Sequence, residues 1–164
     1  MQFMTRRRVT ALWVLPIVLA GFFLSQSQAA DPSSAATAYF AGGCFWCMEE
    51  AFEKVPGVTA VVSGYMGGRV ENPSYEQVSA GGTGHAESVE VVYDPAKVNY
   101  ATLLDAFWHN VDPVTPNAQF CDHGSQYRAV IFFQGEEQKR LAEESKRAIE
   151  QSQRLTHPIV TELT

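Results

Sequence analysis

The stretch TAYFAGGCFWC, residues 37–47, decides the local fold, because it predicts a strand, a glycine turn and the start of a helix in immediate succession. Residues 37–41 are typical of a short strand, and Gly42 and Gly43 interrupt it. Residues 45–54 have the apolar spacing of a helix. The first cysteine of the chain stands at this turn, so the chemistry is expected to begin there.

The elements expected further along the chain continue the same alternation. We expect strands at residues 58–63, 89–93, 127–133 and 158–163, helices at 100–110 and 136–152, and a long loop at 64–84. The order strand-helix-strand, strand-helix-strand is that of the split βαβ arrangement. The sequence therefore predicts an α+β fold, a ferredoxin-like two-layer sandwich with helices on a mixed, largely antiparallel sheet, plus long loops.

Residues 1–30 differ from the rest of the chain. Three arginines at 6–8, an apolar run at 9–24 and the small residues of Ser27-Gln28-Ala29 are the signature of a secretory signal peptide. A membrane anchor is the alternative, but Pro16 and a run shorter than the ~20 residues of a spanning helix argue against it. We expect export, to a bacterial periplasm, by the general or the twin-arginine route.

The part that remains after cleavage is expected to be a flexible lead, residues 31–36, and a single catalytic domain, residues 37–164. A chain of 164 residues with 46% hydrophobic and 18% charged residues suits one globular domain. Removal of three arginines with residues 1–30 changes the formal net charge from -6 to -9. This acidity disfavours nucleic acid as a partner. We expect a monomer that no longer contacts the membrane.

Three cysteines, Cys44, Cys47 and Cys121, lie in the predicted domain, and an odd number in an exported protein indicates at least one free or exchanging thiol. Cys44 follows two glycines where a strand gives way to a helix. Unpaired backbone N–H groups and the positive end of the helix dipole favour a thiolate there. A buried, inert cysteine is the alternative, but the glycine turn and a second cysteine three residues later favour a reactive one.

The pair Cys44 and Cys47 has the spacing of a redox dithiol, because one helical turn brings the two sulfurs close enough to bridge. Haem attachment would need histidine where Met48 stands. A zinc site of the three cysteines with His123 is a further alternative. However, a single residue separates Cys121 from His123, which is too tight for the usual zinc knuckle, so no metal is expected.

Glu87 is the candidate general acid. It precedes the third predicted strand, and alternation places it on the apolar face with Val89 and Val91. Partial burial would raise the pKa of its carboxyl and keep a proton available near neutral pH. The alternative is a strand-end glutamate that points into solvent.

Five motifs follow one another between residue 39 and about residue 133, namely GCFW at 43–46, NPSY at 72–75, GHAE at 84–87, VVYDP at 91–95 and GSQYR at 124–128. In sequence and in order, these motifs resemble those of peptide methionine sulfoxide reductase A. The resemblance implies a split βαβ fold with no metal or organic cofactor. It also implies reduction of the S epimer of methionine sulfoxide, free or in proteins, as repair of oxidised proteins.

The resemblance also implies a role for each matching residue. Cys44 corresponds to the nucleophile, which becomes a sulfenic acid, and Glu87 to the acid that protonates the sulfoxide oxygen. The substrate pocket takes its members from three separate segments, namely Phe45 and Trp46 as the methyl pocket, Tyr75 and Tyr127 as the hydroxyls on the sulfoxide oxygen, and Asp122 as an acidic neighbour. From spacing alone, Phe45 and Trp46 are equally suited to fill the core.

Completion of the cycle needs a resolving thiol and an external dithiol, which is thioredoxin-like in the family. Many relatives have glycine where Cys47 stands and carry resolving cysteines in a C-terminal tail. This sequence has no cysteine between Cys121 and Thr164, so the tail of the family is expected to be missing. We therefore expect Cys47 to resolve, with Cys121 as the alternative. A different function, a thioredoxin-like disulfide exchanger that uses Cys44 and Cys47, needs the same pair but not Glu87.

Overall fold

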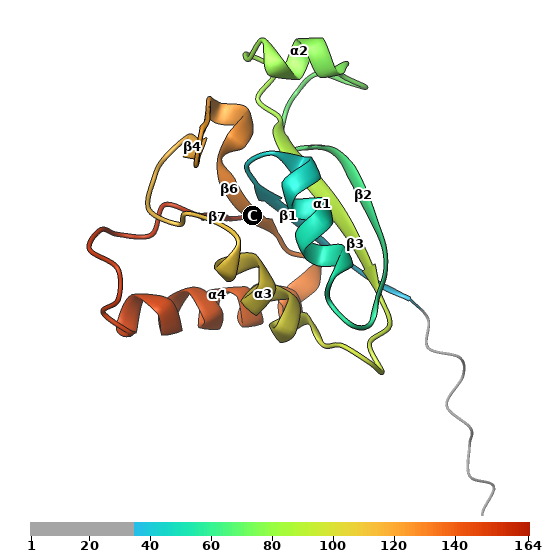
Figure 1. Cartoon of the computed structure of the whole chain (residues 1–164), viewed down its shortest axis with the longest axis vertical. Helices are drawn as coiled ribbons and strands as arrows, with labels where there is room; N and C mark the ends of the chain where they lie inside the picture. Colours follow the sequence, from blue (N-terminus) through green and yellow to red (C-terminus); the bar gives the residue numbers. More distant parts are fainter. Residues whose placement is uncertain (1–34) are drawn as a thin grey trace, which may run out of the picture. The chain divides into compact units, whose positions relative to one another are not determined.

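The computed structural model describes residues 35–164, so the predicted signal peptide and residues 31–34 of the predicted lead lie outside the described residues. Figure 1 shows a twisted sheet with helices against it. The strands are β1 (Ala36–Gly42), β2 (Val58–Met66), β3 (Ala86–Tyr93), β4 (Ala118–Gln119), β5 (Asp122–His123), β6 (Ala129–Phe132) and β7 (Glu162–Leu163). The helices are α1 (Phe45–Glu53), α2 (Tyr75–Ser79), α3 (Tyr100–His109), the 3-10 helix η1 (Ser125–Tyr127) and α4 (Gly135–Gln151). Within residues 35–164 no helix has the length and apolar character to cross a membrane.

The main sheet has five strands in the order β2-β3-β1-β6-β7. Strand β3 lies between β1 and β2 and is antiparallel to both, and β1 is antiparallel to β6. Only the β6–β7 pair is parallel. This confirms the predicted α+β fold with its split βαβ arrangement and largely antiparallel sheet.

One continuous core joins the sheet to α1, α3 and α4. At its centre the buried ring of Phe40 stacks on Phe52, Tyr100 and Phe107, with ring centroids 4.9, 6.1 and 5.4 Å away. Truncation of such a buried aromatic residue to alanine costs about 3–5 kcal/mol. This core fixes the end of β1 and the start of α1, which are the two elements that hold Cys44.

The glycine turn between β1 and α1 packs closely against Val111 and Gln119. A Cβ atom on Gly43 would lie 2.5 Å from Cβ of Gln119, and the φ of Gly43 is +91°. A Cβ atom on Gly42 would lie 2.6 Å from Cγ1 of Val111. Position 43 therefore requires glycine both for backbone conformation and for space, and position 42 requires it for space.

Three local predictions were wrong in detail. The predicted loop at residues 64–84 is shorter, because β2 continues to Met66 and the segment folds into α2. Ser74 caps α2 through a capping box with Gln77, a signal that the sequence contained. Tyr127 lies in η1 rather than in a strand, because positive φ at Gly124 turns the chain before β6 begins. The last strand is confined to β7, residues 162–163.

Candidate active site

Cys44 is the N-cap residue of α1, at the end of the glycine turn. Its carbonyl oxygen accepts hydrogen bonds from the backbone N–H groups of Cys47, at 3.1 Å, and Met48, at 3.2 Å. Its own side chain caps no N–H group, and the residue is half-buried. The sulfur is therefore free to react beside the positive end of the α1 dipole.

Glu87 lies beside Cys44 because β3 and α1 pack together in the core. It is only 2% exposed, on the face predicted by the alternation of β3. The backbone N–H of Phe45 donates a hydrogen bond of 3.0 Å to its carboxyl Oε2. Burial raises the pKa of Glu87, the Phe45 hydrogen bond acts in the opposite direction, and the charge of Asp122 adds to the increase. The Glu87 carboxyl group thus binds the backbone of the residue that follows Cys44, and its raised pKa favours the protonated form.

Four aromatic rings form a continuous group next to this carboxyl. Phe45 is buried and contacts Trp46, Tyr65 and Tyr75, with ring centroids 5.1, 5.7 and 6.4 Å away. Trp46 is 61% exposed and stacks on Tyr75 at 6.0 Å. The sequence spacing did not decide whether Phe45 and Trp46 fill the core or line a pocket. In the structure Phe45 belongs to the core, whereas Trp46 lies at the surface. The sequence reasoning missed Tyr65, although it faces Glu87 in the β2–β3 register.

Asp122 in β5 and Tyr127 in η1 belong to the same group, although they lie far from α1 in the sequence. Burial raises the pKa of the Tyr127 hydroxyl, and the charges of Glu87 and Asp122 raise it further. The pKa of Tyr65 is raised in the same way, by burial and then by Glu87. These hydroxyls stay protonated at neutral pH and can donate hydrogen bonds to an oxygen atom placed between them.

Tyr75 lies in the segment between β2 and β3, here called the Tyr75 loop, which includes α2. Hydrogen bonds with residues close to Glu87 and Tyr127 hold this loop. Nδ1 of His85 accepts the N–H of Gly68 at 3.2 Å, and its Nε2 lies 2.8 Å from the carbonyl oxygen of Val70. Across the loop, Nε2 of Gln126 donates to the carbonyl of Ser79, and Nη2 of Arg128 donates to that of Gly84, both at 3.2 Å. The motifs around Glu87 and Tyr127 thus also tether the loop, a role that spacing alone did not reveal.

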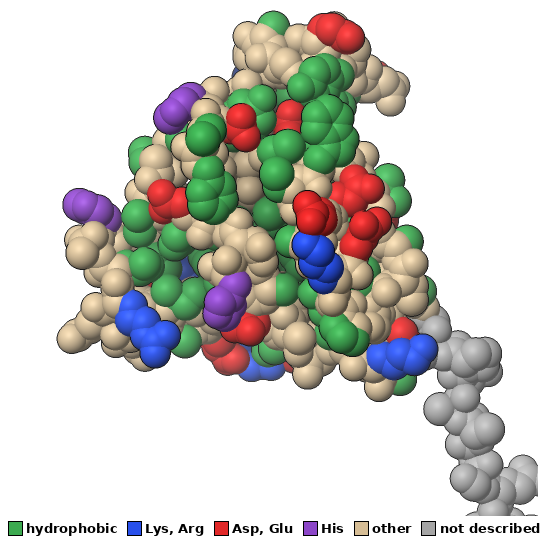
Figure 2. All heavy atoms as spheres, viewed as in Figure 1, with side chains coloured by type: hydrophobic (Ala, Val, Ile, Leu, Met, Phe, Trp, Pro, Cys, Tyr) green, Lys and Arg blue, Asp and Glu red, His purple; other side chains and the backbone are tan. Residues whose placement is uncertain are grey.

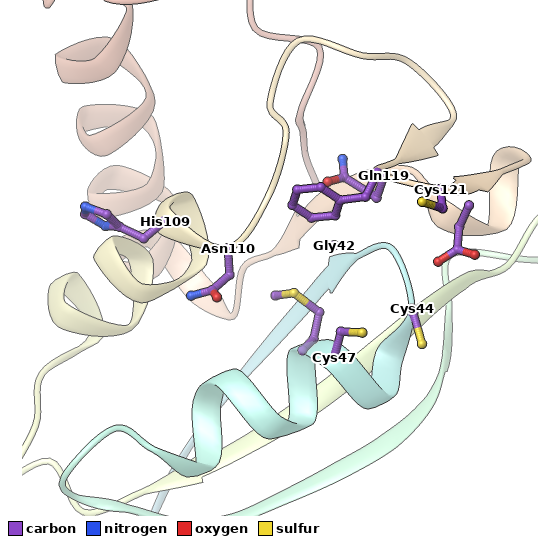
Figure 3. Close-up of a pocket in the computed structure, with 10 residues that line it drawn as sticks. Gly42, Cys44, Cys47, His109, Asn110, Gln119 and Cys121 are labelled. Atoms are coloured by element: carbon purple, nitrogen blue, oxygen red, sulfur yellow. The ribbon is translucent and has the colours of Figure 1, made fainter.

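A cavity of about 440 Å³, here called the cysteine cavity, opens on the other side of Cys44. All three cysteines line it, together with Gly42, Met48, His109, Asn110, Gln119, Phe120 and Asp122. Figure 3 shows Cys47 on α1 and Cys121 on the β4–β5 hairpin, on facing walls. The structure therefore brings the predicted nucleophile Cys44 together with both candidates for the resolving thiol, Cys47 and Cys121, each with a free thiol.

Cys47 is exposed overall, but its thiol interacts with Cys44 and with nearby acids. Partial burial raises the pKa of Cys47, and its hydrogen bond to Cys44 raises it further. The negative charges of Asp122 and Glu50 act in the same direction. In residues 35–164, no group of three or more His, Cys, Asp or Glu side chains is arranged to hold a metal ion.

The peptide methionine sulfoxide reductase family model matches residues 36–164. The chain belongs to this family. Peptide methionine sulfoxide reductase MsrA of Ligilactobacillus salivarius is 53% identical over 127 residues, which span 77% of this chain and 74% of the relative.

Solved structures of methionine sulfoxide reductases have the same fold. Methionine sulfoxide reductase A of Corynebacterium diphtheriae has a TM-score of 0.70 and 33% identity, over 82% of this chain and 66% of the other. Reduced Mxr1 of Saccharomyces cerevisiae has a TM-score of 0.71 and 28% identity, over 80% and 76%. These results confirm the predicted family and the oxidoreductase class of the chain, and they do not favour a disulfide exchanger.

Proposed function

We propose that this chain reduces methionine S-sulfoxide, in oxidised proteins and as the free amino acid, with Cys44 as nucleophile and Glu87 as general acid. The observation that carries the proposal is the contact between the buried Glu87 carboxyl and the first N–H of α1, at Phe45, next to Cys44. A thiolate and a protonated acid are the two groups that removal of a sulfoxide oxygen requires.

The first step uses these two groups together. The Cys44 thiolate attacks the sulfoxide sulfur while Glu87 transfers its proton to the oxygen, which leaves the substrate for Cys44. Methionine departs and Cys44 becomes a sulfenic acid. Tyr75 and Tyr127 hold the oxygen by hydrogen bonds, and Asp122 keeps the site negative so that Glu87 stays protonated.

The aromatic group binds the rest of the substrate. Trp46 is exposed and stacked on Tyr75, so its face offers an apolar wall for the methyl group and thioether, while Phe45 supports that wall from the core. Polarizable sulfur makes favourable contacts of this kind with aromatic rings.

Resolution of the sulfenic acid falls to Cys47. Its thiol condenses with the Cys44 sulfenic acid, a disulfide forms and water leaves. The one-turn spacing between Cys44 and Cys47 at the start of α1, together with the interaction between the two thiols, supports Cys47 rather than Cys121. An external thioredoxin-like dithiol then reduces the disulfide. The structure of Mxr1 in complex with Trx2 supports a protein of that kind as reductant. The enzyme works as an exported monomer in a bacterial periplasm.

Turnover of a peptide with methionine S-sulfoxide, with dithiothreitol as reductant, tests the proposal. Cys44→Ser should abolish methionine formation. After one equivalent of sulfoxide without reductant, mass spectrometry should find Cys44 bonded to Cys47. Activity that survives Cys44→Ser would refute the proposal. A Cys44–Cys121 disulfide in the intact protein would transfer resolution to Cys121.

A further inference from the structure

The two sides of Cys44 differ in what can reach them. The carboxyl and aromatic side receives the sulfoxide substrate in the first step of the proposed mechanism. The cysteine cavity lies on the other side, and Cys47, which is exposed, opens into it. Given the proposed Cys44–Cys47 disulfide, an attacking thiol reaches the Cys47 sulfur through this cavity.

The tip of the β4–β5 hairpin forms the outer edge of the cavity. Phe120 and Cys121, here called the docking rim, are both exposed, and Phe120 is 78% exposed. It is the most exposed of the large hydrophobic residues in the described part of the chain. An aromatic side chain held in water beside a reactive centre is a typical anchor of protein–protein contacts.

Hydrogen bonds at the base of the β4–β5 hairpin hold the docking rim in place. Gln119, 1% exposed, accepts the N–H of Asp112 with Oε1 and donates to the Asp112 carbonyl with Nε2, both at 2.7 Å. The N–H of Gly124 donates to the carbonyl of Asn117 at 2.8 Å across the hairpin base. Phe120 itself has a φ of +52°. A surface fixed before binding loses little conformational entropy on contact.

The charge around the cavity restricts the partner. Asp122 and Glu50 place negative charge near Cys47. In Figure 2, hydrophobic and acidic side chains lie together over the start of α1, whereas Lys and Arg side chains lie lower on that face. This region fits a partner whose surface around its own thiol is apolar. A strongly acidic surface would be repelled by the negative charge near Cys47.

We propose that the docking rim binds the protein dithiol that reduces the Cys44–Cys47 disulfide, an inference that rests on the proposed function. The partner's thiolate attacks the Cys47 sulfur, the bond to Cys44 breaks, and Cys44 leaves as a thiolate. The partner's second thiol then attacks the mixed disulfide and releases Cys47. The partner ends as a disulfide, and both enzyme thiols are reduced.

The test compares a protein reductant with a small one. Phe120→Ala removes the ring, and Phe120→Asn removes it with a residue that tolerates positive φ. With purified thioredoxin as the probe, both variants should raise the KM for reductant about tenfold, as loss of an aromatic anchor does. With dithiothreitol, the KM for reductant, the KM for sulfoxide and kcat should match the wild type. Val62→Ala is the control, since Val62 is 53% exposed on β2 and does not line the cavity.

Each outcome decides the question. An unchanged KM for thioredoxin in both variants would overturn the docking rim. An equal loss with dithiothreitol would also overturn it, because the change would then lie in the disulfide itself. If thioredoxin does not reduce the wild type while dithiothreitol does, this partner class is wrong, whereas the proposed reduction of methionine S-sulfoxide by Cys44 and Glu87 stands. Absence of turnover with either reductant in the wild type would instead refute the proposed function.

Discussion

The two sides of Cys44 are built in opposite ways. The acid side rests on regular elements of the core, with Glu87 on a central strand and bonded to the first turn of α1. The thiol side rests on a hairpin and the exposed surface of α1, with Cys47 and Cys121 both open to water. The difference fits the proposed chemistry: proton transfer from Glu87 needs a carboxyl group shielded from water, whereas thiol exchange needs access for a second protein.

The largest effect that would separate the two sides is expected for Glu87→Gln. Loss of a general acid should lower kcat for sulfoxide reduction by about 10²–10⁴-fold. Oxidation of Cys44 by hydrogen peroxide bypasses the acid, so the Cys44–Cys47 disulfide should still form at the wild-type rate. Glu90→Gln is the matched control, since Glu90 lies on the opposite face of β3 and accepts the Tyr39 hydroxyl at 2.8 Å. Equal losses in the two variants would refute the role of Glu87.

Gly43→Ala should damage both sides at once. The new Cβ atom would collide with Gln119, which supports the hairpin, and alanine is strained at a φ of +91°. We expect a loss of about 1–3 kcal/mol in the free energy of unfolding, measured by urea denaturation. Gly64→Ala is the control, because nothing lies within 4 Å of its added Cβ atom. A Gly43→Ala protein as stable as the control would show that the turn is less constrained than its packing indicates.

The two half-reactions should respond to pH in opposite directions. In the proposed mechanism Glu87 acts when protonated, and its pKa is raised, so sulfoxide reduction should persist above the ordinary range of a glutamate and fall by about tenfold per pH unit beyond that pKa. As the proposed resolving thiol, Cys47 acts as a thiolate, and its pKa is also raised, so disulfide formation should accelerate as pH rises toward that pKa. Burst kinetics of methionine release and stopped-flow measurement of disulfide formation give the two profiles separately. Parallel profiles would refute the division of roles.

The same raised pKa of Glu87 affects stability. Because the folded state holds this proton more tightly than the unfolded chain, its contribution is complete below the unfolded pKa and is lost as pH rises through the folded pKa. In Glu87→Gln, the free energy of unfolding should therefore decline less between mildly acidic and neutral pH than in the wild type. Urea denaturation at several pH values measures this slope, and identical slopes would argue against a proton held on Glu87.

The smallest effect is expected for Gln126→Ala, which frees one tether of the Tyr75 loop. Loss of its hydrogen bond to Ser79 is worth about 0.5–1.5 kcal/mol, so the KM for sulfoxide should rise about threefold with kcat nearly unchanged. Gln138→Ala is the control, because its side chain bonds the carbonyl of Thr37 at 2.9 Å, away from the loop. A similar rise in that control would indicate general destabilisation.

Sequence reasoning succeeded where a property is local. The turn at Cys44, the one-turn spacing to Cys47 and the inward face of Glu87 follow from neighbours within a few residues, and the structure has all three features. It was less successful in the connecting segments. The extension of β2 and the folding of α2 depend on pairing with β3 and on a short capping box that lies inside a glycine-rich stretch.

The sequence by itself determined the fold class, the glycine turn at Cys44 and the apolar face on which Glu87 lies, because hydrophobic alternation and glycine conformation are encoded residue by residue. Only the tertiary structure decided which groups meet. Gln126 and Ser79 are 47 positions apart, and Phe45 and Glu87 are 42 apart, so no local pattern reports their contacts. The placement of Cys121 opposite Cys47 likewise required the anchored hairpin, since its position depends on Gln119 packing against the glycine turn.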